Sequence, residues 1–216
     1  MSSLRTFGGA LALLALTVLW STPVAVQADD HTLRPVTSFA SIEDPAERSK
    51  ALFEEMSRVL THPRCINCHP AGDRPYQGDE PTLHNPPITR GPDGHGVVGM
   101  RCETCHHSSN FDPGQVPGAP HWHLAPLSMA WEGLTVGEIC EQIKDPERNG
   151  GRSLADLQHH VTHDALVAWG WNPGPGREPA PGDQKTFAEL VGAWIAAGAH
   201  CPTSDSGDSQ HGGNAP

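Results

Sequence analysis

The sequence predicts a mainly α-helical domain whose helices are joined by long loops rich in glycine and proline. First, helix-capping residues followed by apolar residues at helical spacing occur on both sides of the middle of the chain. Second, the 23 glycines and 21 prolines among 216 residues must interrupt regular structure often. Third, the motif Cys-x-x-Cys-His occurs twice, at residues 65–69 and 102–106. We therefore expect a mainly α-helical fold whose helices surround the groups bound by these two motifs.

The repeated motif is typical of covalent haem attachment. In c-type haem two thiols add to the vinyl groups as thioethers, and the histidine that follows binds the iron. The covalent anchors would be Cys65, Cys68, Cys102 and Cys105, and the proximal iron ligands His69 and His106. The two cysteine pairs could instead close a four-thiolate zinc site. Because histidine directly follows both pairs, we expect two haem c groups with cytochrome c-like helices around them.

The first 28 residues predict a secretory signal peptide. Arg5 provides the positive charge, residues 10–20 form a short apolar run, and residues 26–28 offer small side chains suited to cleavage. The run is shorter than the about 20 residues that cross a bilayer. We expect a periplasmic protein with no stable membrane insertion after cleavage, and an uncleaved N-terminal anchor is the alternative. Residues 29–40 are expected to form an extended lead-in.

Residues 41–202 are expected to form the dihaem domain, which begins with a helix. Asp44 and Pro45 are suited to its first turn, and Pro63 should stop it just before Cys65. Residues 70–127 then show no sustained helical or strand period. A loop this long that contains the second motif is expected to be functional and ordered by contact with haem.

Three more helices are expected after this loop. One opens with the capping box Thr135–Glu138 and ends before residue 146. The next runs from Ser153 to about Trp169, and the last opens at residues 186–189, with apolar residues at helical spacing. Residues 203–216 are polar and predict a disordered tail.

Cys140 and Cys201 are the two cysteines outside the motifs. In an oxidising compartment an even pair of remaining thiols most simply forms a disulfide. Two buried free thiols are the alternative. In either case these residues are structural.

The sixth ligands of the two irons decide between electron transfer and chemistry at an open iron. Most of the other histidines must be bystanders: His62, His84, His95, His107, His121, His123, His159, His160, His163 and His200. We expect His123 and His160 as distal ligands, because the first adjoins a tryptophan that can pack on a porphyrin and the second can point inward from a helix. Met129 and Met100 are the methionine alternatives, which would raise the reduction potential.

The chain is acidic, with a formal net charge of −11. This charge argues against nucleic acid and anionic membrane surfaces as partners. It allows docking to the basic face of a redox protein, and solubility alone is the alternative explanation.

The chain resembles a family of exported dihaem cytochromes c often labelled isoquinoline 1-oxidoreductase subunits. The resemblance lies in both haem motifs with their flanks and in three further segments, at residues 64–70, 99–106, 118–126, 144–151 and 169–174. The label implies that a molybdenum hydroxylase passes electrons to such a cytochrome. This chain lacks the cysteine pattern of iron–sulfur subunits and a candidate pterin-binding domain, so the resemblance implies an electron acceptor only.

The function expected from the sequence is a periplasmic dihaem electron carrier that passes electrons to a terminal acceptor. No catalytic residue is required for this role. The alternative is a small dihaem enzyme of the peroxidase type, or a gas or redox sensor, in which one haem keeps an open distal face.

Overall fold

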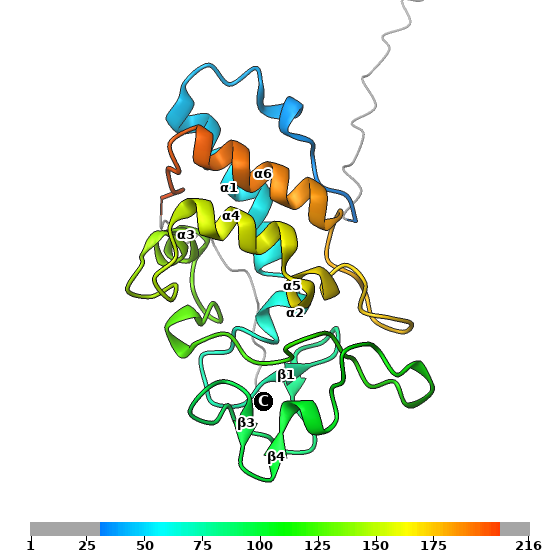
Figure 1. Ribbon diagram of the computed structural model, residues 1–216. Coiled ribbons are helices and arrows are strands. Elements are labelled where there is room, and N and C mark those ends of the chain that lie inside the picture. Colours follow the sequence, from blue (N-terminus) through cyan, green and yellow to red (C-terminus); the bar gives the residue numbers. More distant parts are fainter. Residues whose placement is uncertain (1–30, 204–216) are drawn as a thin grey trace, which may run out of the picture.

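The computed structural model describes residues 31–203, and it confirms a mainly α-helical protein. The expected signal peptide and all but the first residue of the expected tail lie outside the described residues. Figure 1 shows two halves, with most helices together in one half and the small strands among long loops in the other. The lead-in expected at residues 29–40 contains one short 3-10 helix, η1 (Val36–Phe39).

The elements follow the chain in this order. The helical ones are α1 (Pro45–Leu60), α2 (Pro63–Ile66), η2 (Cys102–Thr104), η3 (Asp112–Gly114), η4 (Leu127–Met129), α3 (Val136–Lys144), α4 (Leu154–His163), α5 (Ala165–Trp169) and α6 (Gln184–Ala196). The strands form two antiparallel pairs, β1 (Tyr76–Gln77) with β2 (Thr82–Leu83) and β3 (Gly96–Val97) with β4 (Met100–Arg101).

Helix α1 forms where the sequence predicts it. The Asp44 carboxylate accepts hydrogen bonds from the backbone N–H groups of Ala46 and Glu47, and Pro45 occupies the first helical position. The helix ends at Leu60, before Pro63, as expected. A new turn, α2, then begins at Pro63 and contains Cys65. The first motif therefore begins within a helical turn that follows α1 almost directly in the chain.

The prediction of a single helix from Ser153 to about Trp169 is wrong, because the helix is interrupted at Asp164. The backbone of Asp164 is extended, with φ −73° and ψ 125°, so α4 ends and α5 begins there. Its carboxylate accepts from the N–H groups of Leu166 and Val167, at 2.8 and 3.1 Å. Capping a new helix here replaces the hydrogen bonds that an unbroken helix would have made.

Helix α6 also begins earlier than predicted, at Gln184 instead of residue 186. Asp183 is the N-cap, and its carboxylate accepts from the N–H of Thr186 at 2.7 Å. Glu189 pairs with Lys185, one turn before it, at 2.9 Å. By contrast, the capping box of Thr135 and Glu138 at the start of α3 is confirmed.

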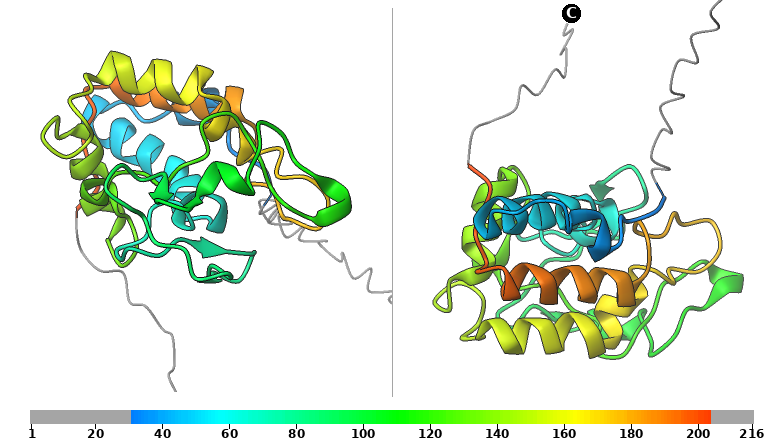
Figure 2. Two further views of the ribbon diagram at one scale, coloured as in Figure 1. Left: turned by 60° about the horizontal axis from the view of Figure 1, so that its bottom comes forward. Right: turned by 90° about the horizontal axis from the view of Figure 1, so that it is seen from above.

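The hydrophobic core lies between the long helices. Helix α6 lies between α1 and α4 and packs against both, as the view from above in Figure 2 shows. Its fully buried Trp194 meets Phe53 of α1 with ring centroids 5.3 Å apart. No helix among residues 31–203 combines the length and the apolar character needed to cross a membrane.

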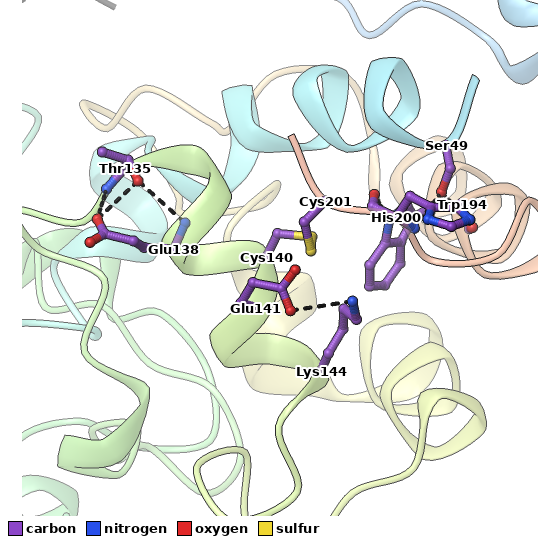
Figure 3. Close-up of a disulfide and its surroundings, with 9 residues drawn as sticks. All are labelled: Ser49, Thr135, Glu138, Cys140, Glu141, Lys144, Trp194, His200 and Cys201. Carbon is purple, nitrogen blue, oxygen red and sulfur yellow. Dashed lines mark hydrogen bonds and ion pairs between the residues drawn. A yellow bond between two sulfur atoms is a disulfide. The ribbon is translucent and has the colours of Figure 1, made fainter. Parts of the chain in front are cut away.

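The predicted disulfide between Cys140 and Cys201 is present and joins α3 to the segment after α6. Figure 3 shows it beside Trp194, whose indole N–H donates to the carbonyl of His200 at 3.0 Å. The hydroxyl of Ser49, on α1, donates to the carbonyl of Trp194 and accepts from the N–H of His200. The end of the described chain is thus attached to three helices, α1, α3 and α6.

Candidate haem-binding sites

The first motif is held in one compact turn. The N–H of Cys65 donates to the carbonyl of His62 at 2.8 Å, and the N–H groups of Cys68 and His69 donate to the carbonyl of Cys65, at 3.0 and 3.2 Å. Both thiols and the imidazole are half-buried. This turn holds the three side chains close to one another, as covalent attachment of one haem requires.

His69 is oriented by two residues far along the chain. Its Nδ1–H donates to the carbonyl of Met129 at 2.6 Å, and its ring stacks on Trp131 with centroids 3.5 Å apart and planes 8° from parallel. A carbonyl can only accept, so Nδ1 carries the proton and Nε2 is free to bind a metal. Burial lowers the pKa of His69 to about 4. The ring is therefore neutral at pH 7, which is the form that ligates iron.

The second motif has the same arrangement in an unrelated stretch of chain. The N–H of His106 donates to the carbonyl of Cys102 at 2.9 Å, across the short helix η2. Its Nδ1–H donates to the carbonyl of Pro117 at 2.7 Å, and its ring stacks on Trp122, again with planes 8° from parallel. Burial lowers the pKa of His106 as well. Each motif histidine therefore has a carbonyl on Nδ1, a tryptophan on one face and an unbonded Nε2 side.

Comparison with known proteins adds no relative. No protein-family model, curated protein or solved structure matches the chain. What each site can bind is therefore argued from its own residues.

The surroundings of the two cysteines in the first motif favour the neutral form of sulfur. Burial raises the pKa of the Cys65 thiol to about 12 and that of Cys68 to about 11. Both thiols are therefore neutral at pH 7 in the protein without a bound group. Within residues 31–203, no three side chains of His, Cys, Asp or Glu meet as a metal site would require.

Buried hydrogen-bond donors without partners lie next to the first motif. Trp131 Nε1, on the ring stacked against His69, has no acceptor, and neither has Nε of the buried Arg90. The other guanidinium nitrogens of Arg90 donate to the carbonyls of Ala125, Pro70 and Gly72. Haem carries negatively charged propionates, which accept such hydrogen bonds. These orphaned donors are what a haem at the first site would satisfy.

The two motifs lie near each other and are joined by packed rings. The charge of Cys102 contributes to the raised pKa of Cys68, although burial is the larger cause. Trp122, stacked on His106, meets the edge of Trp169 with centroids 4.9 Å apart. Trp169 in turn lies beneath the guanidinium of Arg64, which directly precedes Cys65 in the chain. A continuous line of contacts therefore runs from one motif to the other.

The distal candidates expected from the sequence both lie near the first motif. After burial and Arg90, the charges of His160 and His123 also lower the pKa of His69. His123 Nδ1–H donates to the carbonyl of His121, and its ring stacks on His95 with centroids 4.8 Å apart. His160 pairs with Asp164 at 3.4 Å. Both histidines therefore lie within electrostatic range of His69.

The methionine alternatives lie in different surroundings. Met129 is buried in the hydrophobic core, and its carbonyl already accepts from His69. Met100 lies on β4 with 41 % of its surface exposed.

Met129 is expected from the sequence only as a possible iron ligand, whereas in the structure its backbone carbonyl orients His69. Met129 lies 60 residues after His69 in the chain. Whether its carbonyl reaches the imidazole depends on the path of the whole loop between them. Arg90 and the two stacked tryptophans carry no local signal of their roles. Only the general expectation that tryptophans pack in haem pockets points toward them.

Proposed function

We propose that the chain is an extracytoplasmic c-type cytochrome that carries electrons through two covalently attached haems. The observation that carries this proposal is the matching arrangement of His69 and His106. Each donates Nδ1–H to a backbone carbonyl, stacks on a tryptophan and keeps Nε2 free. Such a hydrogen bond fixes the tautomer and orientation of a metal-binding histidine.

The residues of each site have separate tasks in this function. Haem supplies one-electron transfer at its iron. The cysteine pairs would anchor it. The carbonyls of Met129 and Pro117 accept Nδ1–H of His69 and His106, which leaves Nε2 of each histidine available for iron. At the first site, Trp131 Nε1 and Arg90 Nε would donate to a propionate. A cation and buried donors beside a propionate favour its ionised form.

Electron passage between the sites follows from their proximity. The chain of contacts through Trp122, Trp169 and Arg64 connects the two motifs inside the protein. The net charge of −11 favours encounter with partners that present a basic face. The family resemblance suggests a molybdenum hydroxylase as the electron donor, with a separate terminal acceptor.

Haem content of the exported protein tests this proposal. The chain should be produced with its leader in a bacterium that matures c-type cytochromes, and its mass and pyridine haemochrome spectrum measured. We expect two covalent haems in the wild type, one in C65A/C68A and one in C102A/C105A. The variant C140A/C201A is the matched control and should keep both. A chain that carries no covalent haem, or holds stoichiometric zinc, would overturn the proposal.

A further inference from the structure

His84 lies among the long loops that follow the first motif, and the sequence does not mark it as an iron ligand. It directly follows strand β2, and its backbone is held on both sides. Its N–H donates to the carbonyl of Pro75 at 2.9 Å, and its carbonyl accepts from the guanidinium of Arg74 at 2.8 Å. The hairpin of β1 and β2 therefore fixes the position of His84, whose ring is half-buried.

That place is beside the second motif. The rings of His84 and His106 have centroids 5.9 Å apart and planes at 64°. A bond from a metal to an imidazole nitrogen is about 2 Å long. Adding the distance from that nitrogen to the ring centre, two imidazoles on opposite sides of one metal have centroids about 6 Å apart. The observed separation matches this value, and any angle between the ring planes is compatible with it.

The hydrogen bonding of His84 matches that of a ligand. Its Nδ1–H donates to the carbonyl of Pro86 at 2.9 Å, which leaves Nε2 on the other side of the ring for a metal. This is the bond that His69 and His106 each make to a backbone carbonyl. Trp122 stacks on His106, so one flank of that ring is already occupied by protein. His107 is exposed and follows His106 directly in the chain, which makes it a poor ligand for the opposite face.

We propose that His84 is the distal ligand of the iron in the haem attached at Cys102 and Cys105, so that this haem is six-coordinate with two histidines. The inference rests on the proposed function, since it requires haem at the second motif. It names a ligand other than His123 and His160, the two distal ligands expected from the sequence. A haem closed in this way transfers electrons and does not bind exogenous gases readily.

Carbon monoxide binding by the reduced holoprotein tests the assignment. We expect H84A to keep two covalent haems and to bind one more carbon monoxide per chain than the wild type, with a new high-spin signal in the electron paramagnetic resonance spectrum of the oxidised protein. Added imidazole should restore the low-spin spectrum. The variant H107A is the matched control, because it removes an exposed histidine near the same motif, and it should behave as the wild type.

Variants with a single haem assign the effect to one site. In C65A/C68A, which should retain only the second haem, H84A should open that haem to carbon monoxide; in C102A/C105A it should change nothing. If H84A loses the second haem, H84M decides: a raised potential at one haem supports the assignment, and unchanged potentials overturn it. Two haems with carbon monoxide binding like that of the wild type in H84A would also overturn it. Absence of covalent haem from the wild type would instead overturn the proposed function.

Discussion

Trp131 holds His69 in two ways. Its ring lies flat on the imidazole at a centroid distance of 3.5 Å, and its backbone N–H donates to the carbonyl of His69 at 2.9 Å. Trp131 itself is buried in the hydrophobic core. One residue therefore connects the motif histidine to the packed helical half of the protein.

Replacing Trp131 should weaken this connection. We expect W131L to lower the free energy of unfolding by about 2 to 3 kcal/mol, because a stacked aromatic pair and buried area are lost. W131F keeps an aromatic face and should lose about half as much. Urea unfolding followed by circular dichroism measures both. Equal losses in the two variants would show that stacking on His69 contributes nothing beyond volume.

The disulfide should contribute strongly to stability. It closes a loop across 61 positions, so removing it should cost about 3 to 5 kcal/mol. The single variant C201A is informative because it breaks the cross-link and leaves the buried Cys140 side chain in place. We expect it to lose nearly as much as C140A/C201A in urea unfolding. A stable C201A beside an unstable double variant would assign the effect to packing at Cys140.

Glu55 should make stability depend on pH. Its carboxylate is 4 % exposed and accepts from Arg34 and Arg58, at 2.7 and 2.8 Å. Burial alone would raise the pKa of Glu55, but these hydrogen bonds outweigh it and the pKa lies below its usual 4.5. The stabilisation is therefore complete above pH 4.5 and is lost as the pH falls through the folded value.

The variant E55Q should lose about 2 kcal/mol at pH 7, and the difference from the wild type should shrink in acid. The control is E47Q, on the same helix, whose side chain is 63 % exposed and pairs with Lys50. It should lose less than about 0.5 kcal/mol. A loss in E55Q that does not change between pH 7 and pH 3 would contradict the assignment to charge.

Asp164 should be important where α4 gives way to α5. Its hydrogen bond with His160, and those from the N–H groups of α5, lower the pKa of Asp164 to about 2. Since the unfolded value is 3.8, its contribution is present above that pH and is lost as the pH falls toward 2. We expect D164A to cost about 1 kcal/mol, because the side chain is partly exposed, and D164N to cost less, because asparagine also caps helices. Thermal unfolding at pH 7 and pH 2.5 would show whether the charge contributes beyond the cap.

The helices are largely predictable from the sequence because their signals are local. The cap at Asp44 and the capping box at Thr135 and Glu138 lie beside the residues they cap, and both helices form as expected. The break at Asp164 is harder to predict, since the same residue could continue one helix or cap another. Its outcome depends on how α4 and α5 pack with the rest of the chain.

The candidate haem sites also have one part that local sequence predicts and another part that it does not. The motif spacing predicts which cysteines and histidines would hold haem, and counting the remaining thiols predicts the Cys140–Cys201 pair, which the structure confirms. The partners of the histidines do not follow, because the contacts of Met129, Trp131 and His84 with the motifs join segments separated by long loops. Such loops have no periodic signal from which their paths could be read.

The disulfide also reduces the number of pairings that the six cysteines of the chain can form. Six thiols in an oxidising compartment allow many wrong pairings, and any of these would consume a sulfur needed for attachment. Once Cys140 is joined to Cys201, the free thiols are two short pairs, each within one turn of chain. Under the proposed function, an enzyme that attaches haem would then meet only neighbouring thiols, because the disulfide of the helical part has already removed the other two.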